Sequence, residues 1–226
     1  MKAQLLLTLG IAGFMNATGY AQASPVDTVR KVVISSGINL EIERSQEYSL
    51  TVNSSDLDTG CLVRTLENGV LTLKLTSILE CDGKVTARLC CPSVRELEIM
   101  GNAEVSTFNL LKTDSLWIVQ RSGGKAYLDL DVGYLNARLS EGSLLTAKGY
   151  ANTQEISVNA NATFSAFELE GKVVEIDASF GGKGKVCASE KLKAIANMGG
   201  YINYTCDPVT IEIEKKGNGK VEKLTE

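Results

Sequence analysis

The sequence has no histidine among its 226 residues. Histidine is the commonest general base in enzymes and the commonest protein metal ligand. Its absence excludes Ser-His-Asp and Cys-His catalysis within this chain, together with a mixed His/Cys zinc site. Chemistry would have to rest on carboxylates, tyrosines or cysteines, and none of these clusters visibly in the sequence. We therefore expect no catalytic, cofactor-binding or metal-binding residues, no cofactor and no enzymatic activity.

The sequence also lacks a surplus of positive charge, with 23 Lys and Arg against 27 Asp and Glu, and a net charge of -4. Proteins that bind nucleic acid carry basic surfaces, which release counterions from the phosphate backbone. We therefore expect no nucleic-acid partner and no attraction to anionic membranes. Proline is scarce, with three residues against 21 glycines, which suits a chain with many reversals and few breaks.

Long apolar runs are missing after the start of the chain, so no segment matches the ~20 apolar residues of a membrane helix. At the start, an apolar run from Leu5 to Met15 follows Lys2, and the A-x-A form of Ala21-Gln22-Ala23 suits signal peptidase. This pattern predicts a signal peptide at residues 1–23, although cleavage after Ala21 or a buried N-terminal helix would also fit. We expect export to the periplasm or the cell surface, without membrane insertion.

From Leu97 onward the sequence repeats with a period of about nineteen residues. Each unit has a short strand of alternating apolar and polar residues, a small or glycine-rich turn, and a second short strand. One unit cannot bury its own apolar face, but stacked units bury a continuous core. This predicts an all-β fold, a right-handed parallel β-helix, since the leucine-rich-repeat signature is absent. The units begin at Leu97, Leu116, Leu135, Gln154, Val174, Leu192 and Val209.

Residues 28–95 fit the repeat less cleanly but still read as strands. Asn68-Gly69 lies between two of these strands and is a strong hairpin signal. We interpret the region as less regular N-terminal coils or a β cap, which belongs to one domain of residues 24–226. The reason is that the terminal coil of a solenoid exposes strand edges, which a cap covers. A separate small β domain is the alternative. The expected strands are Val29–Ile34, Ile38–Glu43, Tyr48–Val52, Leu62–Leu66, Val70–Leu75 and Val85–Leu89.

The order of these patterns resembles one bacterial family, the auto-transporter adhesin, head GIN domain family. The resemblance covers about residues 26–222 and rests on VRKVVISSGINLEIERSQEYSLTV, ENGVLTLKL, RLCCPSVRELEIMGNAEV and GGYINYTCDPV. The sequence departs from the family at Cys206, where glycine is usual, and at Asn159-Ala160-Asn161, which replaces a glycine turn. The resemblance implies an exported β-helical protein of a kind common in Bacteroidetes, with the family's function unassigned.

Three hypotheses for function follow. The leading one is a non-catalytic, adhesin-like protein that binds a surface partner, a protein or a glycan, through one face of the β-helix. A structural or assembly protein, such as a homo-oligomer stacked through coil faces, is the second. The third is a degenerate carbohydrate-active β-helix enzyme.

Two sets of residues bear on these hypotheses. An enzyme would need paired carboxylates, and Asp129 and Asp131 lie on one strand face, where Asp177 could join them; a solvated strand face is the other interpretation. A glycan-stacking platform would need aromatic side chains, although core packing would also account for them. The aromatic candidates are Trp117, Tyr127, Tyr150, Tyr201 and Tyr204.

Six cysteines are compatible with disulfides in an exported chain. Cys187 and Cys206 lie one coil length apart, so they are the candidate disulfide pair, or else two reduced cysteines in a buried stack. Cys61 and Cys81 could pair with each other or with the doublet Cys90-Cys91, whose side chains must point to opposite faces of a strand.

Overall fold

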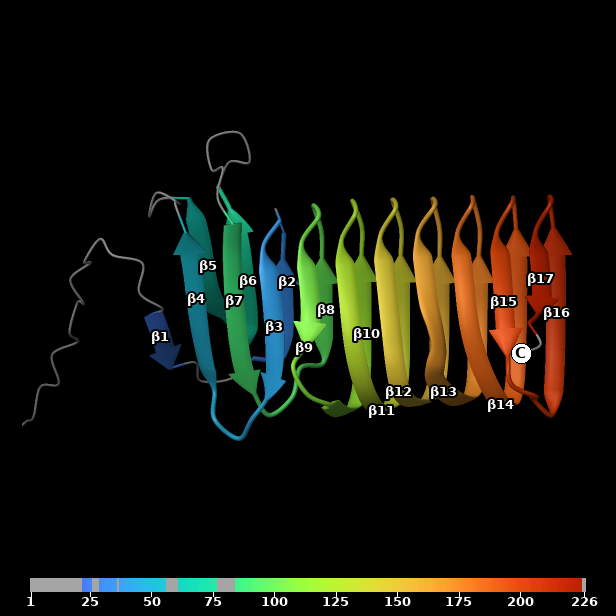
Figure 1. Ribbon diagram of the computed structural model, residues 1–226, viewed down its shortest axis with the longest axis horizontal. Coiled ribbons are helices and arrows are strands. Elements are labelled where there is room, and N and C mark those ends of the chain that lie inside the picture. Colours follow the sequence, from blue (N-terminus) through green and yellow to red (C-terminus); the bar gives the residue numbers. More distant parts are fainter. Residues whose placement is uncertain (1–21, 26–28, 36, 56–60, 77–83, 225–226) are drawn as a thin grey trace, which may run out of the picture.

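The computed structural model describes residues 22–25, 29–35, 37–55, 61–76 and 84–224. Every regular element in these ranges is a β-strand, and they contain no helix with the length and apolar character needed to cross a membrane. The strands form a parallel β-solenoid of about seven turns with coils of about nineteen residues (Figure 1), which confirms the predicted fold class. Apart from Gln22 and Ala23, the predicted signal peptide lies outside the described residues.

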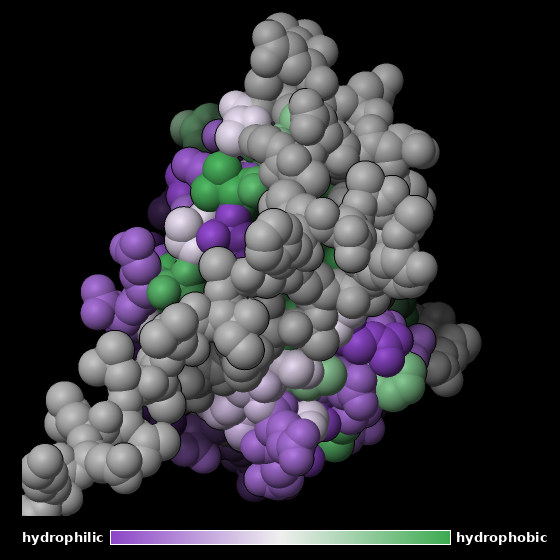
Figure 2. Space-filling model, turned by 90° about the vertical axis from the view of Figure 1, so that its left-hand side faces the viewer, coloured by the Kyte–Doolittle hydropathy of each residue, from purple (hydrophilic) through white to green (hydrophobic). Residues whose placement is uncertain are grey.

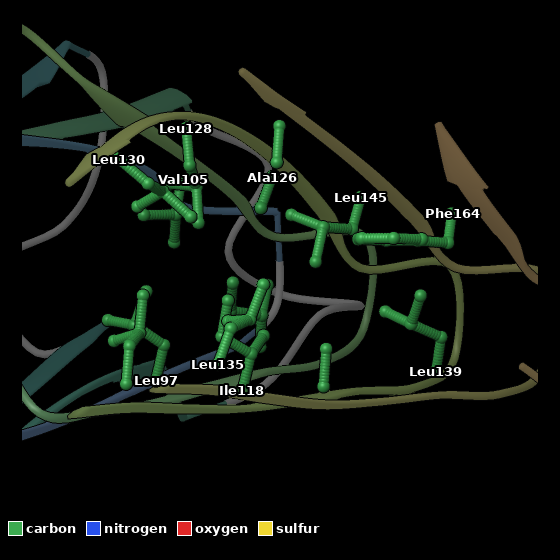
Figure 3. Close-up of a cluster of buried hydrophobic side chains, with 14 of the residues drawn as sticks. Leu97, Val105, Ile118, Ala126, Leu128, Leu130, Leu135, Leu139, Leu145 and Phe164 are labelled. Carbon is green, nitrogen blue, oxygen red and sulfur yellow. The ribbon is translucent and has the colours of Figure 1, made fainter. Parts of the chain in front are cut away.

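The solenoid proper begins at residue 96, and each coil adds strands to two facing walls. The long strands pass from one wall to the other: within β11, Ala126 and Leu128 lie on the wall opposite Leu135 and Leu139 (Figure 3). The solenoid strands are β8 (Glu96–Ile99), β9 (Glu104–Thr107), β10 (Leu111–Gln120), β11 (Lys125–Leu139), β12 (Leu144–Val158), β13 (Thr163–Ala178), β14 (Lys183–Asn197), β15 (Tyr201–Thr205), β16 (Thr210–Lys216) and β17 (Lys220–Lys223).

The register of the coils corrects the sequence alignment of the first and last units. Leu97 lies beside Ile118 rather than Leu116, and Leu192 lies beside Ile211 rather than Val209. Both errors are shifts of two residues, which leave the alternation of inward and outward side chains unchanged. The hydrophobic pattern therefore could not reveal them.

The core is the column between the two walls. Along β11 and the second half of β10, alternate residues point inward and are buried, which is the period-two pattern of a half-buried strand. One wall contributes Leu97, Ile118, Leu135 and Leu139, and the other contributes Val105, Ala126, Leu128, Leu145 and Phe164 (Figure 3).

One corner of every coil is a tight turn whose two central residues have positive φ. In the turn from Asn197 to Gly200, Met198 and Gly199 have φ of 46° and 78°, and the Gly200 N–H donates to the Asn197 carbonyl at 2.8 Å. This is the geometry of a type I′ turn. The fourth residue of the equivalent turns varies among glycine, alanine and serine, at Ala103, Gly124, Ser143, Ala162, Gly182, Gly200 and Gly219.

Replacing Gly200 with alanine is expected to destabilise the protein by about 1–3 kcal/mol, the usual cost of overpacking. A methyl group there would overlap the Ala178 carbonyl oxygen of the preceding coil. Ser143→Ala is the matched control, because this position already carries a Cβ and loses only a 3.4 Å hydrogen bond to the Gln120 carbonyl. Urea denaturation measures both variants, and equal stabilities would contradict the close approach at Gly200.

Six of the N-terminal strands, β2 to β7, follow the predicted ranges closely and form the predicted cap, whereas β1 was not predicted. β2 lies between β6 and β8, and β3 lies between β7 and β9, so these strands belong to the same sheet as the solenoid. β5 and β6 form the hairpin expected at Asn68-Gly69, where both residues have positive φ. The strands are β1 (Gln22–Pro25), β2 (Lys31–Ile34), β3 (Asn39–Arg44), β4 (Ser49–Ser55), β5 (Leu62–Glu67), β6 (Val70–Leu75) and β7 (Lys84–Cys91).

The cap covers the N-terminal end of the core with antiparallel strands. β4 pairs antiparallel with β7 and with β1, which breaks the parallel pattern of the solenoid. Seen from this end, the described surface is mainly hydrophilic, with small separate hydrophobic patches (Figure 2). Antiparallel strands thus cover the N-terminal end of the core, and among the described strands the outermost two, β1 and β5, each keep one unpaired side.

Candidate functional site

One wall of the solenoid carries a groove of about 480 Å³ that runs across four successive coils, from β9 to β13. In-register pairing places Ser106, Tyr127, Thr146 and Ser165 in one outward row across these coils. The groove is lined by Ser106, Thr107, Phe108, Tyr127, Leu128, Asp129, Thr146, Ala147, Lys148, Ser165, Phe167 and Glu168.

Three aromatic rings lie in the groove. Phe108 and Tyr127 are 58% and 41% exposed, although large aromatic side chains usually bury most of their surface, and Phe167 is half-buried. Two of the rings make cation–π contacts. The Arg88 guanidinium lies 5.0 Å from the centre of the Phe108 ring, and the Lys185 ammonium lies 5.6 Å from the centre of the Phe167 ring. Three coil steps of about 4.8 Å separate the first ring from the last, or about 14 Å.

Polar groups alternate with these rings. The Lys148 ammonium lies 3.5 Å from the Asp129 carboxylate, and both side chains remain partly exposed. The Asp129 backbone N–H donates to the Thr107 hydroxyl at 2.9 Å, which joins neighbouring coils at the groove floor. The groove thus offers a carboxylate, an ammonium group and several hydroxyls beside its rings.

Irregular pairing shapes the groove. The register between β12 and β13 shifts between Thr146 and Gly149, and the register between β13 and β14 shifts between Ser165 and Glu170. Gly149 has φ of 100°, and a methyl group there would overlap the Leu130 carbonyl oxygen. Bulges bend a strand and redirect its side chains. We therefore attribute the shape of the groove to the two register shifts and to the backbone conformation at Gly149.

A second hollow of about 320 Å³ lies on the other wall and is rich in carboxylates. Glu155 accepts hydrogen bonds from the Tyr134 hydroxyl at 2.7 Å, which raises the pKa of Tyr134, and Glu175 pairs with Lys193 at 2.6 Å. Burial raises the pKa of Asp177 above its usual value. The hollow is lined by Asn136, Ala137, Arg138, Glu155, Ile156, Ser157, Glu175 and Asp177.

The structure separates the three predicted carboxylates. Asp129 and Asp131 pair with lysines of neighbouring coils, Lys148 and Lys112, on the groove-bearing side of β11. Asp177 lies beside Ser157 on the second wall, in a row with Arg138. The hypothesis that Asp177 joins the other two is wrong. Asp129 and Asp131 lie in the first half of β11, on the groove wall, whereas Asp177 lies near the end of β13, after that strand has passed to the second wall. In the described part of the chain, no three Cys, Asp or Glu residues are grouped to hold a metal ion.

The predicted aromatic platform is not assembled either. Trp117 packs against Tyr134 at a ring distance of 6.0 Å, the Tyr201 hydroxyl donates to Glu222, and Tyr204 is buried. Only Tyr127 of the predicted set lines the groove. Its aromatic neighbours were missed: Phe108 follows directly on β9, and Phe167 lies within β13.

The cysteines fall into two groups. Cys187 and Cys206 form a disulfide with a Cα–Cα distance of 5.4 Å, and Cys61 is also disulfide-bonded. Cys90 is a half-buried free thiol, while Cys91 is buried, as expected for neighbours on a strand. Burial, reinforced by Cys90, raises the pKa of Cys91 to about 12, so it stays an inert thiol. Cys81 lies outside the described residues.

Comparison with known proteins places this geometry in a family. Residues 29–208 match the family model described as "Putative auto-transporter adhesin, head GIN domain". No curated protein matches the chain.

Solved structures share the fold at low sequence identity. A putative adhesin from Bacteroides fragilis is 19% identical with a TM-score of 0.82, over 92% of this chain and 98% of its own. A putative adhesin from Parabacteroides merdae is 17% identical with a TM-score of 0.74, over 93% and 98% of the two chains. A putative lipid binding protein from Parabacteroides distasonis is 16% identical with a TM-score of 0.71, with the same coverage.

Proposed function

Because the chain belongs to the auto-transporter adhesin, head GIN domain family, we propose that it is an exported, non-catalytic, adhesin-like protein that binds a surface glycan through the groove. The three aromatic side chains of the groove, the exposed Phe108 and Tyr127 and the half-buried Phe167, carry the proposal. Export is supported by the signal-peptide pattern of residues 1–23 and by the adhesin family.

A glycan fits the chemistry of the groove better than a protein does. Each sugar ring has an apolar face that packs on an aromatic ring, and a rim of hydroxyls that needs donors and acceptors. The groove supplies both, with rings beside Asp129, Lys148, Thr146 and Ser165. Specific binding sites combine aromatic walls with a few placed polar groups in this way. Since the groove is open along the coil stack, it suits an extended chain.

Several contacts support a binding role over hydrolysis. Glycoside hydrolysis uses two carboxylic groups that flank the scissile bond, one of them a proton donor. In the second hollow, Glu175 is engaged by Lys193, and Glu155 by the Tyr134 hydroxyl and the Asn136 amide. In the groove, Asp129 is paired with Lys148. These contacts resemble the cross-coil ion-pair ladders seen elsewhere on the solenoid surface.

Tyr127→Ala is expected to weaken glycan binding about tenfold, because an aromatic contact contributes about 0.5–1.5 kcal/mol beyond its buried area, and the buried area of the ring is lost as well. The purified chain is applied to an array of neutral and acidic oligosaccharides, and bound sugars are recovered for mass measurement. We expect binding to a subset of these sugars and recovery of the bound sugars with unchanged mass.

Phe180→Ala is the matched control. Phe180 is 60% exposed at a turn outside the groove, with φ of 49°, and Ala160 occupies the equivalent place with φ of 48°. This variant should bind as the wild type does. Absence of binding to every sugar would overturn the proposed glycan, equal losses in both variants would overturn the groove as the site, and shortened sugars would support the enzyme hypothesis instead.

A further inference from the structure

Among the described residues, the last coil of the solenoid is formed by β16 and β17. Among the described strands, β16 pairs only with β14, and β17 pairs only with β15, so one side of each is unpaired (Figure 1). At the N-terminal end, the outermost described strands β1 and β5 also pair on one side only, with β4 and β6, so an unpaired edge alone does not distinguish the two ends. An unpaired strand edge presents a row of N–H and C=O groups to any strand that can reach it.

The core itself reaches the surface at the C-terminal end. Ile211 and Ile213 continue the inward rows of the fully buried Leu192 and Ala194, yet they are 43% and 41% exposed. Val209, just before β16, is 86% exposed. These side chains occupy core positions of a coil that nothing in the described structure covers. An apolar surface next to an unpaired edge is typical of an interaction site.

The charge order of β16 indicates which partner fits this edge. Glu212 and Glu214 come first, and Lys215 and Lys216 follow. A second β16 laid parallel would set acid beside acid and base beside base, which is unfavourable for directly opposed residues. Laid antiparallel with Glu214 at the twofold axis, β16 sets Glu212 opposite Lys216 of the second copy twice, and Glu214 faces its own counterpart once. The antiparallel arrangement thus gives two favourable charge pairs against one unfavourable pair, whereas the parallel arrangement gives no favourable pair.

We infer that two copies of the chain pair tail to tail, with β16 antiparallel to β16 of the second copy and Glu212 opposite Lys216 of that copy. This register places Ile213 opposite Lys215 of the second copy on the core side, where the lysine stem can cover the isoleucine while its ammonium reaches water. An inward lysine on an edge strand also discourages indiscriminate pairing. Pairing two identical patches about a twofold axis closes the assembly at a dimer.

If the groove binds a glycan, as proposed above, the dimer brings two binding sites together. The pairing of the two chains does not depend on that function. A twofold axis perpendicular to the walls keeps each wall continuous with its counterpart in the second copy. The two grooves then open on the same side of the dimer. Two sites on one rigid column can engage one extended glycan together, which raises the overall affinity by avidity.

Charge reversal tests the pairing. The purified wild-type chain should sediment as a dimer, while Glu212→Lys and Lys216→Glu should each raise the dimer dissociation constant at least tenfold. The double variant should restore the dimer, because the reversed charges again oppose each other. Glu170→Lys is the control: this exposed glutamate lies on β13, away from the edge, and the variant should stay dimeric.

Analytical ultracentrifugation over a range of concentrations gives these constants, and circular dichroism shows whether each variant keeps its strand content. A wild-type chain that stays monomeric at the highest concentration would overturn the inference. So would a double variant that dimerises no better than the single variants, or a Glu170→Lys variant that dissociates as they do. These results do not depend on glycan binding, so they are distinct from a failure of the proposed function.

Discussion

Replacing Phe164 with alanine should lower the free energy of unfolding by about 3–5 kcal/mol, the usual cost of removing a buried phenyl ring. The side chain is fully buried in the column, close to Leu145 (Figure 3). Its register neighbours are Leu145 in the preceding coil and Gly184 in the next coil, where a methyl group would overlap Ile176, so the core around the ring is closely packed. A loss of this size is large against a typical total stability of about 5–15 kcal/mol. Urea denaturation monitored by circular dichroism measures it.

Phe180→Ala separates the effect of burial from the loss of an aromatic side chain. Phe180 is exposed at a turn, so its removal leaves no cavity and should change the stability by less than about 0.5 kcal/mol. If the two variants unfold at the same urea concentration, the packed column described for this wall would be contradicted.

Removing the Cys187–Cys206 disulfide should cost about 3 kcal/mol, the value expected from the chain entropy of a loop of this length. The bond fixes the end of β15 to β14, directly before the chain enters the last coil. In the double variant Cys187→Ala and Cys206→Ala, the strands β15 to β17 should therefore lose protection first. Hydrogen exchange of the backbone amides, together with thermal unfolding, measures this.

Cys90→Ala is the comparison for the disulfide variant, because Cys90 is a half-buried free thiol in the N-terminal cap. It should leave the protection of β15 to β17 unchanged. Uniform loss of protection along the whole solenoid in the double variant would contradict a local role for the disulfide.

Much of the fold can be predicted from the sequence because each coil repeats the same local signals. Alternating apolar residues mark the walls, and turn residues such as Asn68-Gly69 mark the reversals. The pairing of Leu97 with Ile118 could not be predicted, since a shift of two residues preserves the alternation. Residues between β9 and β10, including Phe108, take up this difference in length.

The candidate site was harder to predict than the fold. Tyr127 and Asp129 were among the predicted residues, and both line the groove. Phe108 and Phe167 were not, because Phe167 lies within the register shift between Ser165 and Glu170, and Phe108 lies in the connection directly after β9. The scattered tyrosines suggested a platform, but strand alternation buries Tyr204 and the second wall carries Trp117. The register of the coils decides which aromatic residues lie on the same wall, and this register cannot be read from the composition.

The most direct test of the proposed glycan site is a nuclear magnetic resonance titration of the ¹⁵N-labelled chain with the oligosaccharide that binds most strongly on the array. We predict that the largest amide shift changes fall on the groove strands, around Ser106, Tyr127, Thr146 and Ser165. Changes centred instead on the second wall, around Arg138 and Asp177, or an absence of localised changes at saturating sugar, would contradict the groove as the binding site.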